Sequence, residues 1–256
     1  MSHSTVLIVQ VTVLGFCLWL ESVVPVFLRQ PGPRMRHGSR NIAIGLVNGA
    51  VLTAGFSGLV FAAVHWGGAH PVGVLHWITL PAWSERLIGF IVFDLWMYLW
   101  HRANHGLPWF WRFHRVHHSD LAVDVTTALR FHLGEMVLST LLRLAVIPLL
   151  GITLGDLLLY EMILQPVIYF HHSNIALPEA WDRLMRLAVV SPNMHRVHHS
   201  DIPSETNSNY ASIFSFWDRF GRTYRRRDIR TIRYGLKEFL EPRWQTLIGL
   251  LRMPLA

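Results

Sequence analysis

A seven-residue string that carries three histidines occurs twice in this chain of 256 residues. Residues 114–120 and residues 195–201 both read His-Arg-Val-His-His-Ser-Asp. The histidines of each string are spaced i, i+3 and i+4, so on a helix they would share a face. Neutral imidazole is the commonest protein ligand of transition metals. We therefore expect each string to aim three imidazoles at one place, and the two strings to build one buried metal site or two adjacent ones.

Other histidines can join these six. His101 and His105 are four residues apart, and His171 and His172 follow an apolar segment. Because neighbours on a helix diverge by about 100°, we favour His172 of this pair and leave His171 open. A lone histidine such as His132 is more often a hydrogen-bonded core residue than a ligand. The predicted metal ligands are His101, His105, His114, His117, His118, His172, His195, His198 and His199, and the additional candidates are His132 and His171.

The number and type of these donors narrow the choice of metal. A zinc ion takes three or four protein ligands, so eight or more histidines fit two metals better than one. All-nitrogen sites exclude magnesium and calcium and leave zinc, iron, copper and nickel. The only cysteine, Cys17, rules out a cysteine-based zinc site or iron–sulfur cluster. Carboxylates could orient the imidazoles through their second ring nitrogen or could be surface charges and helix caps: the candidates are Asp94, Asp120, Asp124, Glu135 and Asp201.

The elements that must position these residues are apolar helices. Hydrophobic residues make up 52% of the chain and cluster in runs. Residues 5–28 and 41–64 are long enough to cross a bilayer, and a third span from about residue 87 to 100 leads into the first histidines. Residues 135–150 and 153–170 are short for a full crossing; they either form a hairpin that only partly enters the bilayer or cross it, and in both cases the chain returns to the side it left. The predicted fold is all-α, an integral membrane helical bundle with a cytoplasmic histidine-rich helical cap.

The charges suggest how the bundle is oriented. The net charge is +7 and is carried almost wholly by arginine. Residues 29–40 hold four arginines and are expected to form a cytoplasmic loop. Because successive membrane spans alternate in direction, every histidine cluster is then expected on the cytoplasmic face. Residues 1–4 lack a basic start, so the first run is expected to be a retained helix rather than a signal peptide. The arginine run at 225–227 indicates a face near anionic headgroups rather than a nucleic-acid partner.

The histidine spacing resembles the three histidine boxes of the fatty acid hydroxylase / sterol desaturase superfamily. The boxes are His101-x3-His105, His114-x2-His117-His118 and His195-x2-His198-His199. The connecting segments are also similar to this superfamily, among them Trp111-Arg-Phe-His, Arg130-Phe-His132, His172-Ser-Asn174, Ser191-Pro-Asn-Met-His195 and Phe216-Trp-Asp-Arg-Phe-Gly-Arg-Thr-Tyr224. The resemblance covers roughly residues 87–224.

This resemblance implies a membrane-bound non-haem di-iron oxidoreductase that uses O2 to hydroxylate or desaturate a lipid, whether a fatty acyl chain, a sterol or a related compound. It implies two iron ions as cofactors and a ligand histidine between the second and third boxes, which favours His171 or His172. No side chain can oxidise an unactivated C–H bond, so a redox metal must carry that chemistry. The sequence has no Gly-rich nucleotide fingerprint and no fused cytochrome domain. We therefore expect an external electron donor, a cytochrome b5- or ferredoxin-type protein with a reductase.

Two other classes of function compete with this interpretation. A membrane zinc-dependent hydrolase needs fewer histidines and usually a His-Glu-x-x-His motif, which is absent. A non-enzymatic metal transporter or sensor should hold its sites near mid-membrane, whereas these clusters lie at or beyond the ends of spans. A family member that has lost catalysis is disfavoured by the complete boxes.

The expected organisation has three parts: N-terminal transmembrane helices and loops (1–86), a fatty acid hydroxylase-type catalytic domain (87–224) and a basic amphipathic C-terminal tail (225–256). The excess of arginine over lysine hints at a GC-rich bacterial genome. We therefore expect a multi-pass protein of the bacterial plasma membrane rather than the endoplasmic reticulum, with the active site on the cytoplasmic face.

Overall fold

The computed structural model describes residues 2–27, 33–70, 72–77 and 79–256, and α-helices dominate it. The described residues form no strand, only isolated bridge contacts. The helices are α1 (His3–Val23), α2 (Arg34–Ala69), α3 (Ala82–Gly106), α4 (Pro108–His118), α5 (Leu133–Leu150), α6 (Leu154–His172), α7 (Glu179–Met185), α8 (Pro192–His198), α9 (Pro203–Thr206), α10 (Phe216–Phe220) and α11 (Leu247–Arg252). Short 3-10 turns lie at Val74–Trp77, Val125–Leu129, Ile229–Thr231, Lys237–Phe239, Pro242–Gln245 and Met253–Leu255.

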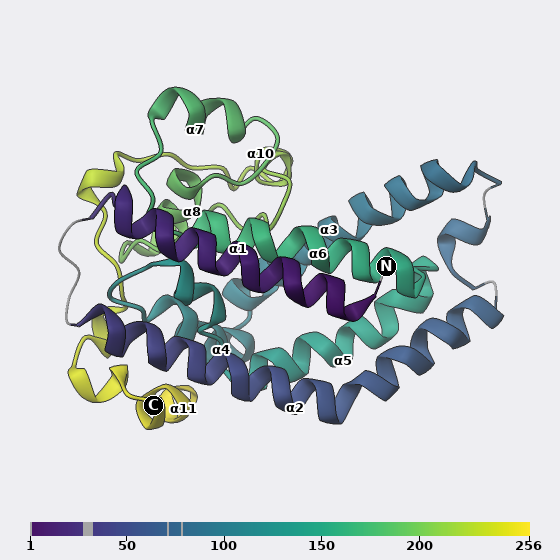
Figure 1. The fold of residues 1–256 in the computed structure, drawn as a ribbon, viewed down its shortest axis with the longest axis horizontal. Helices are drawn as coiled ribbons and strands as arrows, with labels where there is room; N and C mark the ends of the chain where they lie inside the picture. Colours follow the sequence, from purple (N-terminus) through teal and green to yellow (C-terminus); the bar gives the residue numbers. More distant parts are fainter. Residues whose placement is uncertain (1, 28–32, 71, 78) are drawn as a thin grey trace.

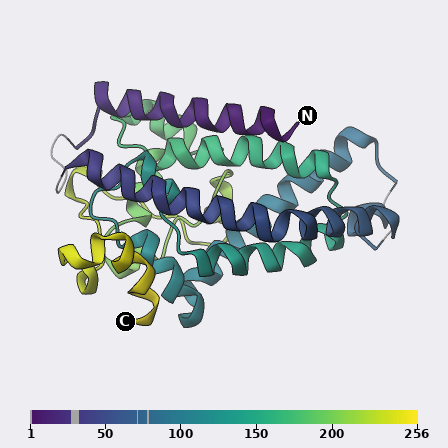
Figure 2. The ribbon, with the colours of Figure 1, turned by 60° about the horizontal axis from the view of Figure 1, so that its bottom comes forward.

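Four of the five longest described helices, α1, α2, α5 and α6, lie side by side and form the body of the molecule (Figures 1 and 2), and the fifth, α3, packs against α5 and α6. Helix α1 packs against α6, and α2 packs against α5. Large apolar side chains such as Leu7, Trp19, Leu46 and Phe61 are exposed on α1 and α2. Exposed apolar surface of this extent is unfavourable in water and suits contact with lipid.

Within the part of the chain that the structure describes, three segments are long and apolar enough to cross a membrane: His3–Val23, Arg34–Trp77 and Leu133–Leu150. Together with the helical architecture, they confirm the predicted membrane helical bundle. Helix α5 is therefore long and apolar enough to span a membrane, although its segment was expected to be short for a crossing. Helix α3, the expected third span, is not among these segments. Helix α3 carries Glu85, Arg86, Asp94 and Arg102, which make it less apolar.

The expected basic loop at residues 29–40 is helical over much of its length. Arg34, Arg36 and Arg40 belong to α2, whereas Arg29 lies outside the described residues. Helix α2 continues for 36 residues because this stretch contains no proline, and glycine alone does not remove a backbone hydrogen bond.

The predicted hairpin of two apolar segments is formed by α5 and α6, which meet at Gly151. This residue adopts φ +80° and closes the end of α5 through its backbone N–H. A Cβ atom at this position would lie 2.9 Å from Nε2 of His76. Both the left-handed backbone and the close ring require glycine here.

The short helices α4 and α7 to α11 form a cap around one end of the bundle, where α1 ends and α2 begins, whereas α3 runs toward this cap from the opposite end (Figure 1). The C-terminal segment belongs to this cap, because Leu250 and Met253 are buried in a cluster with Val116 of α4 and Ile44 of α2. The cap carries the two repeated strings, which lie on α4 and α8.

Candidate metal centre

Buried arginines fix the short helices that carry the repeated strings. Arg130 donates hydrogen bonds to the Val116 carbonyl (3.0 Å) and to Ser119 Oγ (2.9 Å) at the end of α4. Arg196, inside the second string, donates to the carbonyls of Ser173 and Ile175 just beyond α6. These bonds join α8 to the end of α6, so the second string is held against the bundle.

Nine histidines come together in two adjacent groups, and within each group the candidate ligand nitrogens lie within 4.8 Å of one another. We call them the first group and the second group. The first group consists of His101, His105, His114, His118 and His198. The second group consists of His117, His172, His195 and His199.

Each repeated string contributes to both groups, although we expected each to aim its imidazoles at one place. In the first string His114 and His118 join the first group, and His117 joins the second. In the second string His195 and His199 join the second group, and His198 joins the first. On a helix, the side chains at i and i+4 point in nearly the same direction. The side chain at i+3 points tens of degrees away from both, so it can reach the neighbouring group. The two strings therefore interlock.

Hydrogen bonds fix the protonation of two rings in the first group. His101 Nδ1 donates to the Tyr210 carbonyl (2.7 Å), and His198 Nδ1 donates to the Ser208 carbonyl (2.6 Å). A neutral imidazole has one N–H, so Nε2 of each ring is a bare acceptor. These two Nε2 atoms lie 3.0 Å apart. Two lone pairs repel at this distance, and a shared cation removes the repulsion.

The second group repeats this pattern around His172. Its Nδ1 donates to the Ile168 carbonyl (2.8 Å), which leaves Nε2 bare. That atom lies 3.1 Å from Nε2 of His117, 3.0 Å from Nε2 of His195 and 3.3 Å from Nε2 of His199. Nitrogens bound about 2.1 Å from one ion lie about 3 Å or slightly more from each other. The spacing therefore fits donors that share a metal.

Five of the nine imidazoles have a buried ring nitrogen without a hydrogen-bond partner among the described residues: Nε2 of His105 and Nδ1 of four others. Nδ1 of His117, His118, His195 and His199 is buried and finds no hydrogen bond among the described residues. The polar contacts of these rings are with neighbouring imidazoles. Buried polar groups without partners are costly, and coordination of a metal by Nε2, the opposite nitrogen of these four rings, would contribute free energy against that cost.

The electrostatic environment keeps the imidazoles neutral. Burial first, and neighbouring imidazoles second, hold the pKa of His117, His118, His195, His198 and His199 well below the ordinary value of 6.5. Neutral imidazole is the form that binds metal. The donor set is therefore ready for a transition-metal ion near pH 7.

Of the five carboxylates expected near the imidazoles, Glu135 contacts one of the nine. His114 Nδ1 donates to Glu135 Oε1 at 2.8 Å, and both side chains are buried. When this bond forms, Nε2 of His114 is left bare, 3.1 Å from Nε2 of His101. Glu135 lies in the first turn of α5, so the hairpin also orients the first group.

Three of the other four carboxylates bond elsewhere in the structure. Asp94 accepts from Tyr160 Oη (2.8 Å) and Trp217 Nε1 (2.9 Å) and ties α3 to α6 and α10. Asp120 pairs with His37 of α2 at 2.8 Å, and Asp124 caps the turn at Val125–Leu129. Asp201 is half-buried in the cap. The sequence could not distinguish these roles, because each depends on which distant helix packs nearby.

The two additional histidine candidates lie outside both groups. His132 caps α5 by accepting from the Gly134 N–H (3.0 Å), and its Nε2 lies 3.3 Å from the Leu251 carbonyl. His171 is buried with its ring 4.0 Å from that of His195, and its Nδ1 has no partner among the described residues.

Several partners of the imidazoles were not anticipated from the sequence. The carbonyls of Ser208 and Tyr210 fix two rings, and Asn207 Oδ1 lies 3.2 Å from His105 Nδ1. Backbone carbonyls carry no signal in residue type, so no motif could reveal them.

A cavity of about 910 Å³ lies between α1, α2, α3, α5 and α6 and ends at the imidazoles. Apolar side chains of α1, α2, α5 and α6 form most of its wall, for example Leu7, Phe56, Ile147 and Leu158. The imidazoles that line its inner end are those of His101, His114, His117, His171, His172 and His195. Its size is typical of a pocket for a large apolar ligand.

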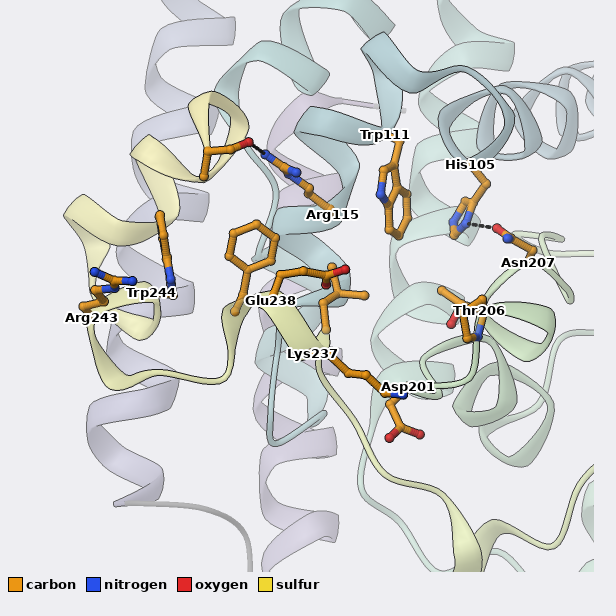
Figure 3. Close-up of a pocket in the computed structure, with 14 residues that line it drawn as sticks. His105, Trp111, Arg115, Asp201, Thr206, Asn207, Lys237, Glu238, Arg243 and Trp244 are labelled. Carbon is orange, nitrogen blue, oxygen red and sulfur yellow. Dashed lines mark hydrogen bonds between the residues drawn. The ribbon is translucent and has the colours of Figure 1, made fainter.

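A second cavity, of about 560 Å³, reaches His105 from the cap (Figure 3). The Asn207 side chain and the indole of Trp111 flank His105 in this view. Apolar side chains such as Leu236, Phe239 and Trp244 line much of the rest, and five charged side chains join them: Arg115, Asp201, Lys237, Glu238 and Arg243. The first group is therefore approached by an apolar cavity from the bundle and, from the cap, by a cavity in which charged side chains stand among apolar ones.

The fold and the site define an integral membrane protein with a buried, histidine-rich centre that can hold metal. The fatty acid hydroxylase family model matches residues 86–223, which is just over half of the chain. The chain therefore belongs to the fatty acid hydroxylase family.

Its relatives include lipid hydroxylases and monooxygenases. Ornithine lipid hydroxylase OlsE of Rhizobium tropici is 28% identical over 144 residues, which cover 56% of this chain and 43% of the relative. Alkylglycerol monooxygenase of Danio rerio is 30% identical over 169 residues, covering 63% of this chain and 35% of the relative. Cholesterol 25-hydroxylase of Mus musculus is 28% identical over 172 residues, covering 60% and 55%. The chain thus spans about a third to a little over half of these relatives, and no solved structure matches it.

Proposed function

We propose that this protein is a membrane-bound non-haem di-iron oxidoreductase that uses O2 to hydroxylate or desaturate a lipid. One observation carries the proposal: two adjacent groups of buried imidazoles, with bare nitrogens facing one another, lie at the inner end of a large apolar cavity. The names of the relatives, which are hydroxylases and monooxygenases of lipids, support the reaction class.

The proposed ligands of one iron are the imidazoles of the first group, and those of the other are the imidazoles of the second group. Bound iron would supply the oxidation of an unactivated C–H bond, which no side chain can perform. Hydroxylation consumes O2, two electrons and two protons and yields an alcohol and one water. Desaturation consumes the same reactants and yields a double bond and two waters.

The roles proposed for the chain's own residues are orientation and exclusion of water. The carbonyls of Ser208 and Tyr210 and the Glu135 carboxylate hold ring N–H groups, so that the opposite nitrogens face the metals. The apolar wall of the large cavity holds a lipid chain against the imidazoles and keeps bulk water out. Since α1 and α2 supply part of this wall, the proposed N-terminal region (1–86) completes the site of the proposed catalytic domain (87–224).

Electrons would come from a separate donor, a cytochrome b5- or ferredoxin-type protein with its reductase. The cap cavity supports an approach from this side, because its wall includes Arg115, Lys237 and Arg243 and reaches His105. The Trp111 ring lies 5.0 Å from the ring of His105 and 5.5 Å from that of His118. An aromatic ring at these distances offers a short path for electrons into the first group.

The same cap holds the arginine-rich segment 225–227, proposed as part of a basic C-terminal tail near anionic headgroups. Basic residues favour the cytoplasmic side of a membrane. We therefore propose that the metal centre lies on the cytoplasmic face, and the excess of arginine over lysine favours a bacterial plasma membrane.

The test is turnover of a lipid pool with heavy-isotope dioxygen. Purified protein loaded with iron and supplied with a reductase and donor should place one heavy oxygen atom in a lipid product, or should form a double bond at the expense of O2. A variant with both His117→Ala and His198→Ala should form neither product. Hydrolysis of lipids without O2 consumption would contradict the proposal and favour a zinc hydrolase.

A further inference from the structure

A charged pair interrupts the apolar wall of the large cavity. Arg143 of α5 and Glu161 of α6 are joined by a Nη1–Oε1 distance of 2.6 Å, and their side chains are 21% and 29% exposed. Both line the cavity. Helix α5 is long and apolar enough to span a membrane. Charged residues in such helices are costly and mark a functional site by default.

Neutral polar side chains extend this patch along the same wall. Gln165 follows Glu161 by one helical turn. The side-chain amide of Gln10, on α1, donates a hydrogen bond to the backbone carbonyl of Glu161 at 3.3 Å. We call Gln10, Arg143, Glu161 and Gln165 the polar station.

The guanidinium of Arg143 has donors to spare. It has five N–H groups, and its acceptors within the described residues are the Glu161 carboxylate and the sulfur of Met97, which lies at 3.3 Å. A thioether is a weak acceptor. Nε has no partner among the described residues. A wholly hydrocarbon ligand would leave these donors unpaired beside it, at a cost in free energy.

The polar station lies at a fixed distance from the metal centre. Arg143 follows Glu135, which bonds to His114, by eight residues on α5, or about 12 Å along the helix. Glu161 precedes His171 by ten residues on α6, or about 15 Å. Both helices therefore place the station about 12 to 15 Å from the imidazoles.

We propose that the polar station binds an oxygen atom of a neutral polar group in the lipid substrate, a hydroxyl or an ester or amide carbonyl, and so sets which carbon reaches the metal centre. The charge of Arg143 is already balanced by Glu161, and a free carboxylate would be repelled by Glu161 in a site of low dielectric. A neutral oxygen accepts from the spare guanidinium donors without that repulsion. This inference rests on the proposed lipid-oxidising function, but its test does not require turnover.

Equilibrium binding without reductant tests the inference. Iron-loaded protein in detergent would bind tritiated 1-octadecanol, with unlabelled methyl stearate, stearate and octadecane as competitors. We expect methyl stearate to compete about as well as octadecanol. Octadecane should compete about tenfold less well, since one hydrogen bond to a charged group is lost, and stearate should also compete less well, because Glu161 repels its carboxylate. The variant Arg143→Met/Glu161→Gln keeps volume and neutrality and should reduce the difference between octadecanol and octadecane to less than twofold.

Two further variants keep the test decisive. Arg143→Lys retains a charged donor and should retain part of the preference, even where the double variant fails to fold. Arg86→Met removes the arginine of an exposed pair with Asp156 and should change nothing. Equal competition by octadecane and octadecanol in the unmodified protein, or an unchanged preference in the double variant, would overturn the inference. If the binding preference is present but no lipid is oxidised, the proposed function fails instead.

With reductant and donor present, the position of oxidation gives a second measurement. The unmodified protein should oxidise octadecanol within a narrow range of carbons, and the double variant should spread oxidation along the chain. Turnover with the same narrow range in both proteins would show that the station does not set the position.

Discussion

Removing the Glu135 carboxylate should weaken metal binding to the first group while sparing the second. Glu135 is 5% exposed and accepts from His114 Nδ1 at 2.8 Å. A hydrogen bond to a charged group contributes about 1.5–3 kcal/mol, and loss of a partner that orients a metal ligand typically lowers metal affinity 10- to 100-fold. We therefore expect Glu135→Leu to lower the affinity of the first group by about that factor. Glu135→Gln keeps an acceptor oxygen and should lose less.

The assay is competition between a chelator of graded concentration and the metal-loaded protein, followed by elemental analysis. The unmodified protein should lose both metals in overlapping steps, whereas Glu135→Leu should lose about one metal per chain at a chelator concentration 10- to 100-fold lower. Asp94→Asn is the matched control, because Asp94 is equally buried but bonds to Tyr160 and Trp217. It should lower thermal stability and leave metal affinity unchanged. If Glu135→Leu releases metal no earlier than Asp94→Asn, the proposed orientation of His114 is wrong.

Three further predictions follow from the site and its scaffold. His118→Ala should remove about one metal per chain from the first group, and His199→Ala should remove about one from the second. X-ray absorption of the metal that remains checks this, and the same ligand environment in both variants would contradict the division into two groups. The buried imidazoles have lowered pKa values, so the unfolded chain binds more protons than the folded one below pH 6.5. Metal retention and thermal stability should therefore fall as the pH drops below about 6.5. Metal content and unfolding temperature that stay constant between about pH 7 and pH 5 would contradict this. Gly151→Ala should destabilise the protein by about 1–2 kcal/mol, because φ is +80° and the new Cβ meets His76, whereas Gly155→Ala, with its nearest neighbour at 3.7 Å, should be neutral or stabilising in thermal unfolding.

The class of the fold and the histidines of the site were accessible from the sequence, because both depend on local spacing. Apolar runs predicted the long helices, and the histidine strings predicted where donors gather. The split of each string between two groups was not predicted. It depends on α4 and α8 facing each other across the site, so that His117 and His198 each point to the neighbouring group.

The partners of the imidazoles were harder to predict, since they depend on packing between distant segments. Asp120 is two residues from His118 in sequence, yet it pairs with His37 of α2. Glu135 lies 21 residues from His114 and bonds to it because α5 packs against α4. Proximity in sequence therefore identified the candidate carboxylates but could not rank them.

The central claim is a two-iron centre, and the metal content of detergent-purified protein grown with iron tests it most directly. We predict about two irons per chain, one for each group of imidazoles, and their loss in the His117→Ala/His198→Ala variant. A single tightly bound zinc that iron does not replace, or a folded protein without stoichiometric metal, would contradict the account.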